Sequence, residues 1–153
     1  MSQLKSYAYP GIGEWAQKNL GYSQAIRVGN RIVCAGQGGW DPSPEIIDLS
    51  KLIKEDLMEE IDQAFSNVNH NLKHAGGKGW EQVYKVVTYS TDIRAQHNRI
   101  VENLRKWMPN HTAVWTEIGV SQLGADDMHF EIEVEAFDEE GAKEVSKTKA
   151  RAA

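Results

Sequence analysis

Three glutamates near the end of the sequence, Glu131, Glu133 and Glu135, alternate with apolar residues. Successive side chains of a β-strand point to opposite faces, so a strand over 128–137 places the three carboxylates on one face and the apolar side chains on the other. Such a row is either a solvated surface or, where one member enters a cleft, a source of general acid or base catalysis. The alternation predicts the strand and leaves both roles open.

A fourth carboxylate, Glu117, lies two residues after Trp115 in the segment 112–120, which is also predicted to be a strand. A spacing of two places both side chains on one face of that strand. A carboxylate beside an indole is partly desolvated, as acid catalysts often are. Glu117 is therefore a candidate general acid with Glu131 as the corresponding base, and the alternative for Glu117 is a surface position on an edge strand.

The glycine-rich segment 36–42 is a candidate binding loop. Its sequence, Gly-Gln-Gly-Gly-Trp-Asp-Pro, suits no regular element, and its glycines allow backbone amides to approach a ligand closely. Cys34, the one cysteine of the chain, precedes it in an apolar segment without a Cys or His motif partner. This setting favours a buried small hydrophobe over a nucleophile.

The sequence carries no clear signature of a metal or a cofactor. His70 and His74 lie four apart on a predicted helix, a spacing that suits one metal ion, but no third ligand accompanies them. The chain has no phosphate-binding loop, no complete dinucleotide fingerprint and no nucleophile elbow. We therefore predict neither a metal site nor a cofactor.

Composition places the chain among single-domain proteins of a reducing compartment. It has 153 residues and a formal net charge of −5, which disfavours generic binding to nucleic acid. No segment has the apolar length of a signal peptide or a membrane span, and a lone cysteine excludes an internal disulfide. These features predict a cytoplasmic protein without membrane contact.

The regular elements follow from the spacing of the apolar residues. A Gly-Asn pair between two short apolar segments predicts a β-hairpin over 24–36. Apolar residues at three- and four-residue steps predict helices over 51–75 and 95–108, and a segment of β-branched and aromatic residues predicts a strand over 83–91. With the two later strands, this order predicts an α+β fold in which two helices cover one face of a mixed sheet. The other face also needs a cover, so we expect an oligomer.

The two ends of the chain have a different character. Residues 1–20 contain Pro, Gly and scattered aromatics, and we interpret them as an extended arm of a single domain that spans 1–137. Residues 138–153 are almost all small or charged, which predicts a flexible C-terminal tail.

The segment Gly-Tyr-Ser-Gln-Ala at 21–25, followed after a strand by Gly-Gln at 36–37, resembles the YjgF/Rid (reactive intermediate deaminase) family. The strand over 83–92, Asn98 and the closing Glu-Ile-Glu strand extend the resemblance over residues 20–137. The resemblance implies a chorismate-mutase-like α+β fold, assembled as a homotrimer with clefts between neighbouring subunits. Members of the family hydrolyse reactive imines and enamines without a cofactor, and others are described as endoribonucleases or translation inhibitors.

The resemblance also implies which residues form the cleft. By position, the substrate-binding residues are Tyr22, Gly36 as a backbone amide donor, Gln37 beside it, and Asn98 on the second helix. Glu131 matches the carboxylate that positions water, and Glu133 is the alternative if the preceding loop aligns differently.

The chain departs from the family pattern at the start of the strand over 112–120. Deaminating members carry an arginine there, which binds the substrate carboxylate through two charge-assisted bonds, whereas this chain has Trp115. Many members carry cysteine where this chain has Glu117. Without the arginine we expect Trp115 to help bind a neutral or aromatic substrate by stacking.

The sequence as a whole predicts a cofactor-independent hydrolase of imines or enamines, or an enzyme of related acid–base chemistry. Glu131 and Glu117 are the predicted catalytic residues. One alternative is a ligand-binding or regulatory trimer that has lost catalysis. A further alternative is an endoribonuclease or translation inhibitor, which the negative charge disfavours.

Overall fold

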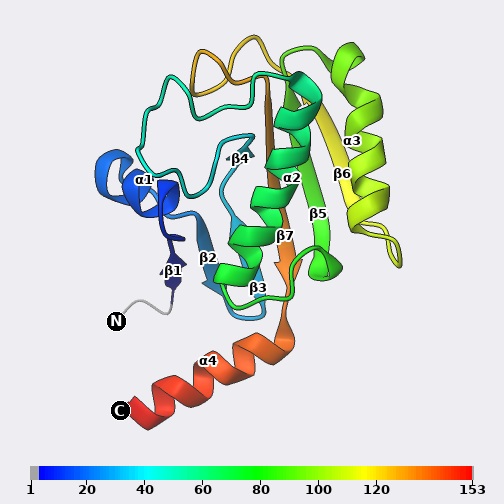
Figure 1. Ribbon diagram of the computed structural model, residues 1–153. Coiled ribbons are helices and arrows are strands. Elements are labelled where there is room, and N and C mark those ends of the chain that lie inside the picture. The colour runs from blue at the N-terminus through cyan, green and yellow to red at the C-terminus, as the bar shows by residue number, and fades with distance from the viewer. Residues whose placement is uncertain (1–3, 153) are drawn as a thin grey trace.

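One mixed sheet runs through the computed structural model, which describes residues 4–152. In chain order the elements are β1 (Lys5–Tyr7), α1 (Ile12–Leu20), β2 (Ala25–Val28), β3 (Arg31–Cys34), β4 (Gln37–Gly38), α2 (Leu57–His74), the 3₁₀ helix η1 (Trp80–Gln82), β5 (Val83–Ser90), α3 (Ile93–Trp107), β6 (Val114–Gly119), β7 (Phe130–Phe137) and α4 (Glu139–Ala152). The strand order is β1-β2-β3-β7-β5-β6, with β4 also paired to β7 (Figure 1). Only β5 and β6 run parallel, so the sheet is mixed as predicted.

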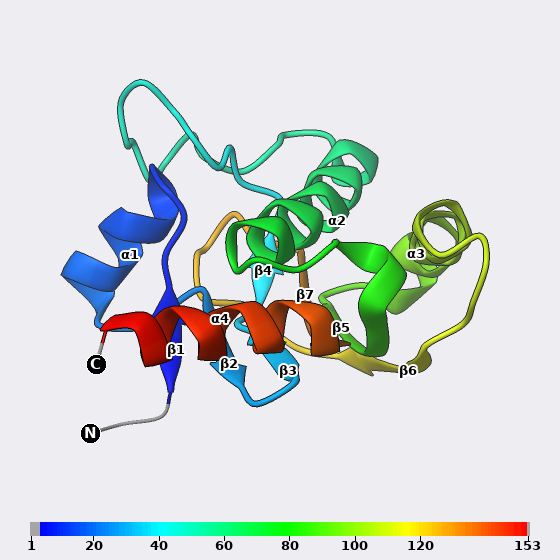
Figure 2. The same ribbon diagram turned by 90° about the horizontal axis from the view of Figure 1, so that it is seen from below.

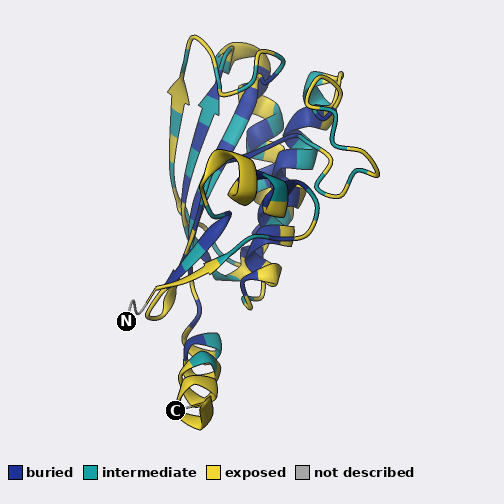
Figure 3. Ribbon diagram, turned by 90° about the vertical axis from the view of Figure 1, so that its left-hand side faces the viewer, coloured by how far each residue is buried: buried dark blue, intermediate teal, exposed yellow. Residues whose placement is uncertain are grey.

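Helices α2 and α3 lie on one side of the sheet and leave its other face uncovered (Figure 3). Both helices begin at an aspartate whose carboxylate accepts backbone N–H groups of the first turn: Asp56 from Met58 and Glu59 at 2.9 and 3.0 Å, and Asp92 from Ala95 at 3.1 Å. Such caps satisfy donors that have no partner inside the helix. The predicted α+β layer is therefore confirmed.

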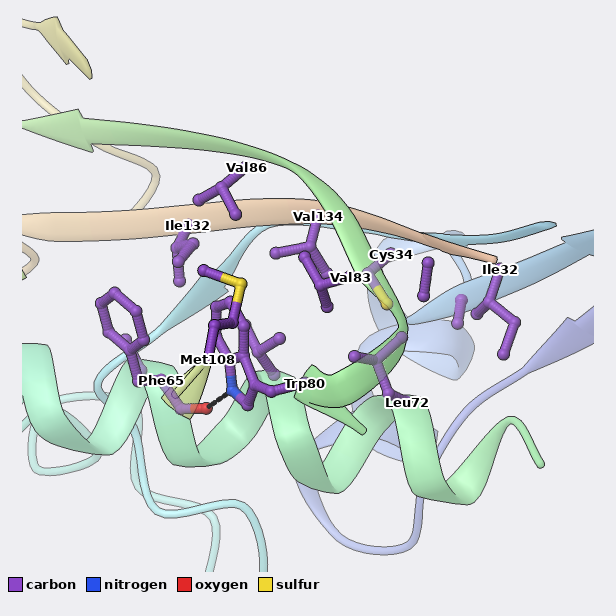
Figure 4. Packing of buried hydrophobic residues seen from close by; sticks show 14 of the residues in the cluster. Ile32, Cys34, Phe65, Leu72, Trp80, Val83, Val86, Met108, Ile132 and Val134 are labelled. Carbon is purple, nitrogen blue, oxygen red and sulfur yellow. Dashed lines mark hydrogen bonds between the residues drawn. The ribbon is translucent and has the colours of Figure 1, made fainter. Parts of the chain in front are cut away.

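The core lies between α2 and the central strands (Figure 4). Phe65 stacks on Trp80 with ring centroids 5.1 Å apart, and Phe130 packs beyond it at 6.2 Å. The buried Trp80 indole donates to the carbonyl of Phe65 at 2.9 Å, so its one polar atom is satisfied. Cys34 belongs to this core, where burial raises the pKa of its thiol to about 12, so the thiol is not poised to act as a nucleophile.

The prediction of an extended arm over residues 1–20 is wrong for residues 4–20, and residues 1–3 lie outside the described part of the chain. Lys5–Tyr7 pairs antiparallel with β2, and Ile12–Leu20 forms α1. Gly11 (φ 85°) and Gly21 (φ 79°) flank this helix in conformations that glycine adopts readily, so they bound it rather than prevent it. The interpretation as an arm rested on Pro10, Gly11 and Gly13, but Gly11 precedes the helix and Gly13 is accommodated in its first turn.

The segment 138–153, for which the sequence predicts a flexible tail, contains a helix in the part that the structure describes. Glu139–Ala152 forms α4, which projects from the end of β7 (Figures 1 and 2). Asp138 accepts bonds from Arg27 at 2.7 Å, Gln82 at 3.0 Å and the N–H of Gly141 at 3.1 Å, which fixes the start of α4. Most of α4 is exposed (Figure 3), because it offers no continuous apolar face.

Candidate functional site

An apolar cavity of about 580 Å³ opens beside the break between β3 and β4. Its walls come from α1, from the segment between β4 and α2, from the segment before β7, and from β7 itself. The lining residues are Ile12, Trp15, Ala16, Leu20, Tyr22, Ala35, Gly36, Trp40, Leu49, Leu52, Ile53, Gly124, Ala125, Met128 and Glu131. Two residues predicted to bind substrate, Tyr22 and Gly36, thus lie in the same cavity as the predicted catalytic Glu131.

The carboxylate of Glu131 lies directly over Gly36. A Cβ atom placed on Gly36 would overlap Oε1 of Glu131, so only glycine leaves room for this arrangement. Burial raises the pKa of Glu131, and the nearby charge of Glu133 raises it further. No side chain in the described part of the chain forms a hydrogen bond or an ion pair with Glu131. The site therefore holds an unpaired carboxylate in apolar surroundings, a setting suited to proton transfer.

Backbone hydrogen bonds hold the long segment between β4 and α2 against the cavity. Asp41 donates its N–H to the carbonyl of Leu52 and Lys54 donates to Gly39, both at 3.1 Å. Ile12 at the start of α1 donates to the carbonyl of Pro42, also at 3.1 Å. Figure 2 shows this segment arching beside α1. The two together form the apolar wall that faces Glu131.

Gln37, a predicted substrate-binding residue, does not line the cavity. Its side chain is completely buried, accepts a bond from the Tyr9 hydroxyl at 2.9 Å and donates to Gln24 at 2.8 Å. It also donates to the carbonyl of Gly36 at 3.2 Å. Because every polar atom of Gln37 has a protein partner, the assignment to substrate binding is corrected: Gln37 fixes the backbone that carries Gly36.

A second group of candidate residues lies on β6 and α3. The Trp115 indole donates to Oγ1 of Thr88 at 3.0 Å and stacks on the His97 ring with centroids 5.7 Å apart. Glu117 lies 2.7 Å from Nδ1 of His97, and its side chain is 15 % exposed. Its other oxygen, Oε1, is buried and has no hydrogen-bond partner among the described residues. Trp115 and Glu117 thus share one face of β6, as their spacing predicts.

Glu117 and Glu131 lie on opposite faces of the sheet. Glu117 pairs in register with Thr88, which is buried under the helices, whereas Glu131 pairs with the next residue of β5, Tyr89, which points to the uncovered face. Residues paired across two strands point to the same face of the sheet, and successive residues of one strand point to opposite faces. Within one protomer the predicted acid–base partnership is therefore not formed, because the sheet separates the two carboxylates.

Two remaining predicted residues lie outside the cavity. Asn98 is exposed on α3 and does not line the cavity. Glu133 accepts a hydrogen bond from the Tyr89 hydroxyl at 2.6 Å and does not line the cavity. Of the two alternatives for the cleft carboxylate, the geometry favours Glu131 over Glu133.

Sequence reasoning missed two parts of these sites. His97 was assigned no role, although it is the partner of Glu117; its position on a helix gave no sign of what it contacts. The wall supplied by α1 was missed as well, although apolar residues at Ile12, Trp15, Ala16 and Leu20 have helical spacing and glycines flank them.

The fold is that of an α+β protein with a mixed sheet and two covering helices, and it contains an apolar cavity that is lined by one carboxylate. Residues 16–137 match the model of the family described as Endoribonuclease L-PSP. The chain belongs to this family, which is the YjgF/Rid family, as its sequence pattern predicts.

Individual relatives agree with this assignment. The chain is 37 % identical over 81 residues to a RutC family protein of Pyrococcus abyssi, a match that covers 52 % of this chain and 59 % of the relative. It is similar to the structure of a member of the YjgF/YER057c/UK114 family from Mycobacterium tuberculosis, with a TM-score of 0.70, 22 % identity, and coverage of 88 % of this chain and 99 % of that one. It is also similar to RidA from the Antarctic bacterium Psychrobacter sp., with a TM-score of 0.66, 24 % identity, and coverage of 87 % and 94 %. These two structures show a shared fold.

Two further kinds of feature, a membrane-spanning helix and a metal-binding group, are absent from residues 4–152. No helix there combines the length and apolar character needed to cross a membrane. No group of three or more His, Cys, Asp or Glu side chains in that range is arranged to hold a metal ion.

Proposed function

We propose that this protein is a cofactor-independent hydrolase that acts on the C=N bond of an imine, or on the related enamine, carried by a neutral or aromatic molecule. The observation that carries the proposal is the unpaired Glu131 carboxylate over Gly36, at the wall of an apolar cavity. Burial raises the pKa of Glu131, which makes its carboxylate a stronger base towards water.

In the proposed reaction a protonated imine and water give a carbonyl compound and ammonium. Glu131 takes a proton from water as the water oxygen adds to the imine carbon, and this addition produces a neutral carbinolamine. A carboxylic acid then donates a proton to the nitrogen. The C–N bond breaks, ammonia leaves, and the hydroxyl proton passes to ammonia as the carbonyl forms. Glu131 then returns its proton to the ionised acid through solvent, which restores the starting enzyme. The backbone N–H of Gly36 and the side chain of Tyr22 hold the substrate during these steps.

Glu117 is the proposed acid, and its position makes an oligomer necessary. Because Glu117 and Glu131 lie on opposite faces of one sheet, they can share a substrate only if they come from different subunits. A homotrimer with clefts between subunits, which the family resemblance implies, provides such an arrangement. Trp115 and Asn98 would then join the cavity of a neighbouring subunit. The apolar residues Val114 and Ile118, 68 % and 38 % exposed on the uncovered face of β6, support burial against another copy.

The test is hydrolysis of two imine classes, one neutral and aromatic and one bearing a carboxylate, each generated in the assay and followed by ammonia release. We expect faster hydrolysis of the neutral class. Glu131→Gln should lower turnover by about 10² to 10⁴. Glu135→Gln, a change on the same face of β7 outside the cavity, is the matched control and should retain activity. Absence of acceleration for both imine classes would reject the hydrolase.

A ligand-binding trimer without catalysis is the second candidate, favoured by the absence of the family arginine at Trp115. It predicts a ligand that binds in the cavity and is recovered unchanged. RNA cleavage, which the description of the family model names, is a third candidate that the net charge disfavours. Binding or cleavage of single-stranded RNA at low salt would support it.

A further inference from the structure

The lining of the cavity carries negative charge without a balancing positive charge. Of the described residues that line it, Glu131 alone carries a charge, and no Lys, Arg or His side chain reaches it. A ligand with a carboxylate would therefore place a second negative charge beside the first, at a cost that the apolar walls increase. Electrostatic repulsion from Glu131 therefore disfavours anions, whereas an arginine at this cavity would attract them.

Trp40 presents ring carbons to the cavity, because its N–H is paired elsewhere. The Trp40 indole donates to the Tyr9 hydroxyl at 3.0 Å, and that hydroxyl donates in turn to Gln37 at 2.9 Å. The Glu131 carboxylate, in contrast, has no side-chain partner in the described part of the chain.

Three aromatic side chains, Trp15, Trp40 and Tyr22, line the cavity together with Glu131. The faces of aromatic rings carry partial negative charge and attract organic cations. Aromatic faces and one carboxylate form a combination that recognises a positively charged nitrogen attached to an apolar body. Neutral ligands satisfy the aromatic walls but leave the charge of the carboxylate unbalanced.

We propose that this cavity binds an organic cation: an aromatic or otherwise apolar body that carries an ammonium or a protonated imine and lacks a carboxylate. A cavity of about 580 Å³ is in the range of small-molecule sites. The cation offsets the desolvation of Glu131 and stabilises its ionised form, which is the form that accepts a proton from water. That this ligand is the substrate rests on the proposed function; that it binds does not.

The test is equilibrium binding of three matched probes, 2-phenylethylammonium, 2-phenylethanol and 3-phenylpropionate, by calorimetry at low salt. We expect the ammonium to bind about tenfold more tightly than the alcohol, because a charged partner strengthens the bond to the carboxylate, and the propionate to bind more weakly than both. Glu131→Gln should remove the preference for the ammonium, and Glu135→Gln should keep it. Equal binding of all three probes, or a preference that survives Glu131→Gln, would overturn the proposal.

A second variant tests the charge argument from the opposite direction. Leu49 lines the cavity and is 52 % exposed, so Leu49→Arg adds a cation at the rim without disturbing the core. We expect this change to weaken binding of the ammonium and to strengthen that of the propionate. If the probes bind as expected but no imine is hydrolysed, the hydrolase proposal fails and the cation site stands. If imines are hydrolysed without a cation preference, the cation site fails alone.

Discussion

Glu131 and Glu117 occupy contrasting environments in one sheet. Glu131 lies on the uncovered face, over a glycine and among apolar walls, and no side chain in the described residues pairs with it. Glu117 lies on the helix-covered face, where His97 holds one of its oxygens and Trp115 stacks on His97. The first carboxylate is free to act on a ligand inside the cavity, whereas the second is oriented by its neighbours.

The contrast shows that catalytic potential depends on partners as well as on residue type. Both residues were predicted to be catalytic because carboxylates perform proton transfer. Of the two, Glu131 shares a cavity with other predicted site residues in one protomer, and burial together with a neighbouring charge raises its pKa. Glu117 acts on the same ligand only across a subunit boundary.

The largest expected effect tests whether the two carboxylates meet between subunits. Glu131→Gln and Glu117→Gln should each lower imine hydrolysis, the first by about 10² to 10⁴. When the two variants are co-expressed and assemble at random, about a quarter of the clefts combine both unchanged glutamates and should recover activity. Activity is measured on mixed oligomers separated by two affinity tags. Mixed oligomers no more active than the average of the two homo-oligomers would show that the two residues do not meet between subunits.

The next effect concerns the space that Gly36 leaves for Glu131. Gly36→Ala places a methyl group where the carboxylate lies, so the flexible end of Glu131 must move. We expect turnover to fall by about ten- to a hundredfold with little change in melting temperature, because positioning is lost and the core is untouched. Gly124→Ala is the matched control: it lines the same cavity, but its added Cβ meets nothing within 4 Å. Equal activity in both alanine variants would refute the positioning argument.

A smaller effect is expected when the family arginine is restored. In Trp115→Arg the new guanidinium lies on the same face as Glu117, two residues away, and pairs with it. In this variant we therefore expect only a weak shift of substrate preference towards imines that bear a carboxylate. In Trp115→Arg/Glu117→Gln, where the guanidinium has no carboxylate partner, we expect the preference to shift by about tenfold. The ratio of the kcat/KM values for the two imine classes measures this preference. An equal ratio in the single and double variants would show that Glu117 does not control charge at this position.

The smallest effect is on stability, and it has opposite signs for two glutamates of β7. The folded state raises the pKa of Glu131, so ionised Glu131 destabilises the fold above the unfolded pKa, and the cost disappears as pH falls below it. Tyr84 and Lys85 lower the pKa of Glu135, so this residue stabilises the fold above the unfolded pKa and loses that contribution as pH falls through the folded pKa.

At pH 7, Glu131→Gln should therefore raise the melting temperature and Glu135→Gln should lower it, each by roughly a few degrees. Both differences should shrink when melting is measured at progressively lower pH. A decrease in melting temperature for Glu131→Gln at pH 7 would mean that the carboxylate has a stabilising partner and would weaken the argument for a free base.

The sequence by itself determined the hairpin of β2 and β3, the strands β5, β6 and β7, the two covering helices and the family, but neither β1 nor β4. These follow from local patterns: alternation in β7, helical spacing in α2 and α3, and a turn pair in which Gly29 takes a φ of 57°. The same patterns placed Trp115 and Glu117 on one face of β6. They misjudged the two ends, where α1 and α4 form, because Pro and Gly near the start, and small and charged residues at the end, were taken as signs of irregular structure.

Only the tertiary structure decided what each candidate side chain faces. Spacing along β6 and β7 says which residues of one strand share a face, but the register across β5 decides that Glu117 and Glu131 point to opposite sides. Burial of Gln37 and the pairing of His97 with Glu117 likewise depend on contacts between residues far apart in the chain. A sequence fixes alternation within a strand, whereas the packing of whole elements sets the neighbours that control charge, solvent access and chemistry.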